Sequence, residues 1–135
     1  MDQSANLLKL ARTRFPNADW IESRMEDFTS TERFAGAVCW DALFHVERSY
    51  HEGLLRKMAT FLYPRGKIML TVGGSDHPPF TDTMFDQPFY YDSHPPDKVI
   101  ELLMKLGFNI LTAEFLDMPT SGRDKGRYAI VAIIP

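Results

Sequence analysis

Two side chains that can move protons or hold a polar ligand, Asp41 and His45, directly follow the apolar run 35–40. A short continuous apolar run of this kind is typical of a strand covered on both faces. Open α/β sheets place their sites at the carboxyl ends of such strands. His45 is therefore a candidate general base, because an imidazole takes up a proton near neutral pH. The alternative is that His45 only stabilises a helical turn.

A second acidic side chain, Asp2, stands two residues before Ser4, and Ser4 opens an amphipathic segment that reaches Phe15. Serine is a favoured N-cap residue, so a helix is expected over residues 4–15. An acidic residue at the end of the strand before such a helix accepts hydrogen bonds from ribose hydroxyls in Rossmann-like folds. Asp2 is thus a candidate nucleotide-binding residue.

The stretch 73–91 has no clear periodicity and is rich in aromatic residues. Phe85, Phe89, Tyr90 and Tyr91 could stack on a planar molecule or shield a cation, or they could pin the stretch to the core. A loop of this length in a small domain is usually functional. We therefore expect an ordered lid or substrate wall.

Other chemically capable side chains are more dispersed. Arg123 lies in the polar stretch 119–125 and could grip an anionic substrate, although a solvated turn is the simpler interpretation. His51, His77 and His94 are scattered along the chain without the spacing of metal ligands, so no metal site is expected.

Hydrophobic periodicity predicts the elements that would position these side chains. Helices are expected over residues 4–15, 49–62 and 95–106, strands over 20–22, 35–40, 67–72, 108–116 and 128–134, and turns at 63–66 and 119–125. Strand 35–40 is expected in the middle of the sheet. This order predicts a single domain over residues 1–135 with an α/β three-layer sandwich, whose mostly parallel sheet closes with an antiparallel C-terminal hairpin.

The composition limits the classes of protein to which this chain can belong. The 135 residues are 44% hydrophobic and carry a formal charge of −3, which supports a packed core and argues against a broad nucleic-acid-binding surface. The single cysteine, Cys39, lies in the apolar run and is expected to be buried. No run approaches the roughly 20 apolar residues of a membrane span. We expect a cytoplasmic protein without nucleic-acid or membrane partners.

Three segments resemble the class I S-adenosylmethionine (SAM) dependent methyltransferases. Residues 2–12 are similar to the Asp-x-Ser-x-x-(Met/Leu)-Leu-x-x-Ala-Arg segment after the family's second strand. Residues 34–46 resemble its fourth strand and the His-containing turn, and residues 62–70 its Leu-x-Pro-Gly-Gly turn and fifth strand. The terminal hairpin distinguishes this family from nicotinamide-binding folds, so a nicotinamide oxidoreductase fragment is disfavoured.

The resemblance implies SAM as cofactor and a small molecule as methyl acceptor. The catalytic candidate is His45. Residues implied to bind the cofactor are Asp2 (ribose), Met25 and Glu26 (adenine), and Trp40 and Asp41; those implied to contact the acceptor are Phe85, Tyr90, Tyr91 and Arg123.

The chain also departs from the family pattern. Arg24 stands where the family usually has an acidic residue that meets the adenine amino group, and Ala35 stands where an Asp often begins the fourth strand. The family's first strand and its Gly-x-Gly-x-Gly turn have no counterpart here, so the fold is interpreted as truncated at the N-terminus. We therefore expect weak or no activity from this chain alone.

Without that first strand, strand 35–40 would have one unpaired edge, and exposed edges invite strand addition. Segment 20–22 could pair with it, a second copy could, or another chain could supply the missing residues. We expect a dimer or other oligomer through this strand. The rival interpretation of function is a non-catalytic interaction or oligomerisation module that reuses the methyltransferase fold.

Overall fold

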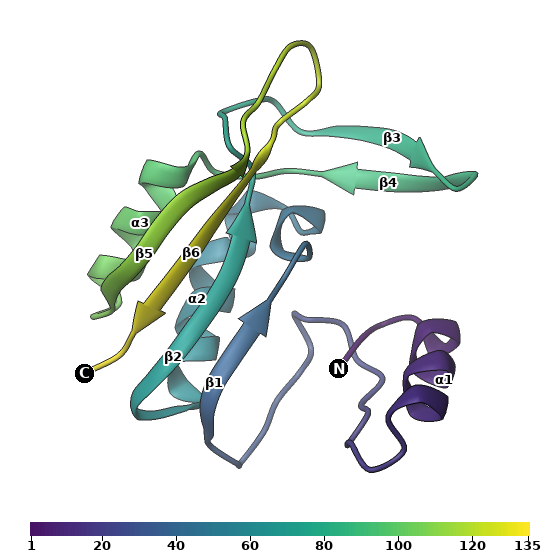
Figure 1. Cartoon of the computed structure of the whole chain (residues 1–135), viewed down its shortest axis with the longest axis vertical. Coiled ribbons are helices and arrows are strands. Elements are labelled where there is room, and N and C mark those ends of the chain that lie inside the picture. Colours follow the sequence, from purple (N-terminus) through teal and green to yellow (C-terminus); the bar gives the residue numbers. More distant parts are fainter. The chain divides into compact units, whose positions relative to one another are not determined.

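The computed structural model describes residues 1–135, which divide into two compact units, Met1–Thr31 and Glu32–Pro135. Each unit is described by itself (Figure 1). The elements in chain order are α1 (Ala5–Arg14), β1 (Phe34–Cys39), the 3-10 helices η1 (Leu43–His45) and η2 (Arg48–Tyr50), α2 (His51–Thr60), β2 (Leu62–Val72), β3 (Phe80–Met84), β4 (Gln87–Tyr91), α3 (Pro96–Lys105), β5 (Asn109–Asp117) and β6 (Arg127–Ile133).

The first unit contains α1 and the segments on either side of it. Ser4 caps α1 as predicted, because its hydroxyl accepts a hydrogen bond from the Leu7 N–H at 3.3 Å. The predicted strand 20–22 is reduced to one isolated parallel bridge between Asp2 and Glu22. Asp2 therefore ends an extended segment immediately before the helix.

The second unit is built on a four-stranded sheet with the order β1-β2-β6-β5. β1 and β2 are parallel, whereas β2 with β6 and β5 with β6 are antiparallel. The α/β class and the antiparallel C-terminal hairpin are thus confirmed, but the expectation of a mostly parallel sheet is wrong. Only β1 and β2 are joined by the helical crossover that parallel pairing requires.

Helices α2 and α3 cover the same face of this sheet, so the second unit by itself has two layers (Figure 1). Alternation along β2 explains the arrangement, since Ile68 and Leu70 are fully buried while Met69 between them is 39% exposed. The fully buried side chains of this core include Leu43, Leu55, Leu62, Ile68, Leu70, Val72, Val99, Leu103 and Ile130.

Strand β1 lies at the edge of the sheet and not in its middle, which corrects the prediction from the apolar run. It pairs only with β2, and Val38 is 70% exposed. The run is rich in Ala and Gly, whose exposure costs little, so its apolar character is a weak sign of burial. Within the second unit the expected unpaired edge is present. Cys39 is buried as predicted.

The stretch 73–91 contains a β-hairpin rather than an irregular loop. β3 and β4 pair antiparallel around the turn residues Phe85 and Asp86, which have φ values of 53° and 60°. Hairpin turns of this type normally carry Asn-Gly or Asp-Gly, so the sequence has no recognisable turn signal here. Pro88 also argues against a strand, but a two-stranded ribbon consists only of edges, where proline is tolerated. Figure 1 shows the hairpin extending away from the larger sheet.

The predicted turn at residues 63–66 lies within the long strand β2. Arg65 has a φ of 65°, and the pairing of β1 with β2 shifts register between Phe34 and Gly36. The chain thus bends here while the ladder continues. None of the helices has the length and apolar character needed to cross a membrane.

Candidate functional site

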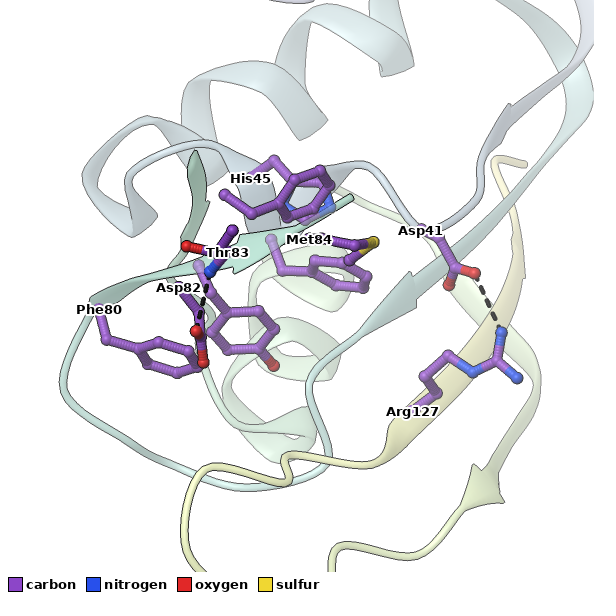
Figure 2. Close-up of a pocket in the computed structure, with 10 residues that line it drawn as sticks. Asp41, His45, Phe80, Asp82, Thr83, Met84 and Arg127 are labelled. Atoms are coloured by element: carbon purple, nitrogen blue, oxygen red, sulfur yellow. Dashed lines mark hydrogen bonds and ion pairs between the residues drawn. The ribbon is translucent and has the colours of Figure 1, made fainter. Parts of the chain in front are cut away.

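The carboxylate of Asp41 is held at the end of the sheet where β1 and β2 finish and β6 begins. The Asp41 N–H donates to Thr71 Oγ1 at 2.7 Å, and the Thr71 hydroxyl donates to Asp41 Oδ1 at 3.0 Å. Arg127 Nη1 donates to Asp41 Oδ2 at 3.0 Å, as Figure 2 shows. Asp41 has a φ of 47°, which is uncommon for a residue with a side chain. The contacts with Thr71 fix this conformation and the direction of the carboxylate.

Arg127 bridges two aspartates. Besides its bond to Asp41, its Nε donates to Asp117 Oδ2 at 2.6 Å. These two hydrogen bonds, with Asp117 contributing more, raise the pKa of Arg127 above its ordinary value. The guanidinium is thus committed to partners within the chain.

His45 ends the 3-10 turn η1 and is fixed in one tautomer. Its Nδ1 lies 2.8 Å from the Tyr90 carbonyl oxygen. A carbonyl can only accept, so Nδ1 carries the proton and Nε2 of the neutral ring carries the lone pair. Burial lowers the pKa of His45 below its ordinary value, although the Tyr90 carbonyl and the Asp41 charge oppose this shift. His45 is therefore a neutral imidazole near pH 7, the form that a general base needs.

Aromatic rings surround His45. The rings of Phe44 and Tyr91 stack with centroids 5.2 Å apart and an interplanar angle of 29°, and Phe80 and Tyr91 stack at 5.2 Å and 23°. Phe89 meets the His45 ring edge-on at 4.0 Å. Three near-parallel rings and one perpendicular pair therefore form a rigid aromatic wall.

These groups line a pocket of about 550 Å³ in the second unit (Figure 2). Its volume falls within the range of small-molecule sites, roughly 300–1,000 Å³. The lining residues are Asp41, Phe44, His45, Phe80, Asp82, Thr83, Met84, Phe89, Tyr91 and Arg127. A mostly apolar cavity with a few directed polar groups is the usual form of a binding or active site.

The structure brings three of the predicted site residues together, since Asp41, His45 and Tyr91 all line this pocket. Arg123 lies beside it: its guanidinium is 5.1 Å from the centroid of the Phe80 ring, and it lines an adjoining hollow of about 490 Å³. Tyr91 also borders that hollow. Its hydroxyl is buried without a hydrogen-bond partner, and burial raises the pKa of Tyr91 to about 12.

Three other predicted residues do not line the pocket. Phe85 occupies the hairpin turn with its side chain 92% exposed. Tyr90 contributes its carbonyl to His45, while its hydroxyl lies 3.4 Å from Asp92. Trp40 is 43% exposed.

The remaining predicted residues, Asp2, Met25 and Glu26, belong to the first unit. Asp2 Oδ1 accepts from the Ser4 N–H at 2.7 Å. The bridge between Asp2 and Glu22 is parallel, so the chain runs in the same direction at both residues. The residues that follow Glu22 therefore leave the bridge on the same side as the residues that follow Asp2. This placement fits a ribose-binding carboxylate.

The adenine contact fits less well. Glu26, the predicted adenine-binding carboxylate, forms an ion pair with Arg24 at 2.7 Å. Met25 lies between these two residues in a turn. Of the predicted nucleotide-binding side chains in the first unit, Glu26 therefore already has a charged partner within the chain.

Several pocket residues were missed from the sequence, namely Phe44, Phe80, Asp82, Thr83, Met84 and Arg127. The spacing of Phe80, Asp82 and Met84 at every second position could have indicated one face of a strand. Arg127 lies between the predicted turn 119–125 and the predicted strand 128–134, and no local signal links it to Asp41. No group of three or more His, Cys, Asp or Glu side chains in residues 1–135 could hold a metal ion.

Comparison with known proteins identifies the fold. No protein-family model and no curated protein matches the chain. Among solved structures, a putative SAM-dependent methyltransferase from Listeria monocytogenes matches with a TM-score of 0.80 and 14% identity, over 98% of this chain and 78% of that one. The glycopeptide N-methyltransferase MtfA, solved with S-adenosylhomocysteine, matches with a TM-score of 0.69 and 18% identity, over 98% and 71% of the two chains.

A third match is the 1,6-didemethyltoxoflavin-N1-methyltransferase of Burkholderia thailandensis, with a TM-score of 0.68, 18% identity and coverage of 96% of this chain. The chain spans 56% of the length of that enzyme. At these identities the likeness concerns the fold. The chain has the Rossmann-like fold of the class I SAM-dependent methyltransferases.

Proposed function

We propose that this protein is a SAM-dependent methyltransferase that acts on a small molecule, with the pocket around His45 as its acceptor site. The observation that carries the proposal is the hydrogen bond from His45 Nδ1 to the Tyr90 carbonyl. It orients the ring and leaves the lone pair on Nε2, within a pocket of suitable size.

SAM would supply an electrophilic methyl group on its sulfonium sulfur. Asp2 would hold the ribose, Met25 and Glu26 the adenine, and Trp40 and Asp41 the part of the cofactor nearest the acceptor. The ion pair with Arg24 already occupies the Glu26 carboxylate that would meet the adenine. The chain also contains no Gly-x-Gly sequence. We therefore expect low affinity for SAM from these 135 residues alone.

His45 would take the proton that the acceptor loses as its nucleophilic atom is methylated. The Asp41 charge acts through space in favour of the protonated ring, so it would stabilise the imidazolium as it forms. Two of the similar structures are N-methyltransferases, which supports a nitrogen nucleophile. Phe44, Phe80 and Tyr91 would exclude water around it.

A second candidate function, a non-catalytic interaction module, rests on the free edge of β1. An unpaired edge can add a strand from another chain, and Val38 is 70% exposed beside it. Homo-oligomer formation through β1 would serve either function. A cytoplasmic location is part of the proposal, because the single Cys39 forms no disulfide within the chain.

Calorimetry with S-adenosylhomocysteine tests the enzyme proposal. Asp2→Asn keeps an oxygen that can accept from the Ser4 N–H, but it removes the charge that would meet the ribose. We expect roughly 10-fold weaker binding, as for loss of a charged hydrogen-bond partner. Asp19→Asn, at an exposed position of the same unit, should bind like the unmodified chain.

Two results would contradict the enzyme proposal: no binding up to millimolar ligand, or equal losses in both variants. Light scattering at micromolar concentration addresses the second candidate. A dimer that dissociates when Val38 is replaced by Lys supports pairing through β1, and a monomer at all concentrations excludes it.

A further inference from the structure

We propose that the acceptor is an amine carried on a flat aromatic ring and bound as its ammonium cation. This inference rests on the proposed function and specifies the substrate class of the same pocket. It uses two properties of the lining that the function alone does not require, namely the stacked rings and the balance of charge.

The stacked rings favour a flat ligand. The planes of Phe44 and Phe80 make angles of 29° and 23° with the plane of Tyr91, so each is stacked on the Tyr91 ring. Phe89 and Met84 line the same cavity. A planar ring can stack on such a wall, whereas a puckered ring of equal volume loses that contact. The wall therefore discriminates by shape.

The charges of the lining favour a cation. Two carboxylates, Asp41 and Asp82, face one guanidinium, Arg127, and His45 is neutral. Asp82 Oδ1 accepts from the Thr83 N–H at 2.8 Å, and Oδ2 forms an ion pair with Arg123 at 3.4 Å. Both side chains of this pair are about 60% exposed, so the interaction is weak. Aromatic faces also attract cations. The carboxylates and the aromatic faces of the lining would therefore both attract the ammonium group of a ligand.

An anionic ligand has no matching partner in this pocket. Arg127 is the cation of the lining, and its Nη1 and Nε already donate to Asp41 and Asp117. A ligand carboxylate bound to the remaining N–H groups of Arg127 would lie close to the negative charges of Asp41 and Asp117. The pocket thus selects against acidic acceptors.

The same arrangement accounts for the chemistry of an amine. The ammonium must lose one proton before its nitrogen can attack, and the Nε2 lone pair of His45 is the acceptor for it. With SAM bound, the nitrogen would form a bond to the methyl carbon, and the electron pair of the broken C–S bond would stay on sulfur. The products would be the methylated ammonium ion, protonated His45 and S-adenosylhomocysteine.

NMR titration of the full chain with three probes tests the inference: 2-phenylethylamine, 2-cyclohexylethylamine and 3-phenylpropionate. We expect 2-phenylethylamine to bind at least 5-fold more tightly than either of the others, with shifts in the His45 and Tyr91 resonances. The cyclohexyl probe keeps the charge and removes the flat ring. The carboxylate probe keeps the ring and reverses the charge.

Two variants separate the contributions. Phe80→Leu should weaken 2-phenylethylamine about 5-fold and leave 2-cyclohexylethylamine nearly unchanged, because it removes stacking and retains apolar volume. Asp82→Asn should weaken both amines. Asp86→Asn, at the exposed turn of the same hairpin, is the matched control and should change neither.

Equal binding of the two amines, tighter binding of 3-phenylpropionate, or no binding of any probe would overturn the inference. The titration with S-adenosylhomocysteine described above reports separately on the proposed function. Loss of cofactor binding with amine selectivity retained would reject the enzyme and keep the ligand class, whereas the opposite result would reject only the ligand class.

Discussion

Arg127 and Asp41 are 86 residues apart in the sequence and are joined by a hydrogen bond of 3.0 Å between Nη1 and Oδ2. Asp41 follows β1 and Arg127 begins β6, and in the sheet β2 lies between these strands. Thr71 of β2 completes the contact through its hydroxyl. One ion pair therefore spans three strands at the end of the sheet that carries the pocket, and it sets the charge that His45 experiences.

Replacing Arg127 by Met should raise the pKa of His45. The Asp41 carboxylate would lose its cationic neighbour, so its charge would favour the imidazolium more strongly. A pH titration of the His45 ring proton by NMR measures this shift. Because both side chains are about 40% exposed, stability should fall by less than about 1 kcal/mol.

The matched control is Arg56→Met, which removes a surface cation paired with Glu52 on α2. It should leave the His45 titration unchanged. An unchanged or lowered pKa in the Arg127 variant would show that Asp41 does not act on His45.

Replacing Arg48 by Met should destabilise the protein by about 3 kcal/mol. Arg48 donates to Asp92 from its backbone N–H at 2.7 Å and from Nε at 2.5 Å, and the Asp92 side chain is 5% exposed. Arg48 also bonds Asp76 at 3.0 Å and the His77 carbonyl. It thereby ties the segments on both sides of the β3–β4 hairpin to η2. Urea denaturation measures the loss.

Arg56→Met is again the control, and its cost should stay below about 1 kcal/mol. Acid unfolding gives a second readout. Burial alone would raise the pKa of Asp92, but the hydrogen bonds and charge of Arg48 outweigh burial and lower it. The pair therefore stabilises the fold above the ordinary pKa of an aspartate, near 4, and this contribution is lost as pH falls through the lowered value. The Arg48→Met variant keeps the backbone N–H donor to Asp92, so it should show a smaller loss over this pH range than the unmodified chain.

The outcome for the sequence-based predictions depends on how local the cause of each feature is. The helices 5–14 and 96–105 and the strands 109–117 and 127–133 follow from caps and periodicity within their own segments, and they were predicted to within one or two residues. The hairpin 80–91 was missed because its turn uses Phe85 and Asp86 in a conformation that glycine usually adopts.

The residues of the candidate site also differ in how local the cause of their position is. Asp41 and His45 could be predicted because strand ends are recognisable in the sequence. Arg127 could not, since it joins the pocket only through the pairing of β2 with β6. Contacts of that range leave no local pattern in the chain.

Stability should fall as the pH is lowered from about 7 to 5, in part through His51. His51 is fully buried; its Nε2 lies 2.9 Å from the Val46 carbonyl, and its Nδ1 has no hydrogen-bond partner. Burial and the nearby His94 lower the pKa of His51, although Asp92 opposes them. The unfolded chain therefore binds more protons below its ordinary pKa, near 6.5, and stability is lost there.

His51→Gln keeps a donor for the Val46 carbonyl and removes the titratable group. Urea midpoints measured between pH about 7.5 and 5 should decline less in this variant than in the unmodified chain. His94, whose pKa is also lowered mainly by burial, should account for a further part of the decline. Parallel pH profiles for the two proteins would contradict the role of His51.

Replacing the turn residues Phe85 and Asp86 by Asn and Gly should stabilise the β3–β4 hairpin by about 1 kcal/mol. Both residues have positive φ, and Phe85 contributes no packing because it is 92% exposed. Hydrogen exchange of the amides in β3 and β4 is the appropriate measurement, since the hairpin can open without global unfolding. Slower exchange confined to these amides is expected.

Gly126→Ala is the opposite control: Gly126 has a φ of 62°, and a Cβ there would overlap the Asp117 carbonyl, so that variant should be destabilised. Unchanged or faster exchange in the Asn-Gly variant would mean that the turn is not strained.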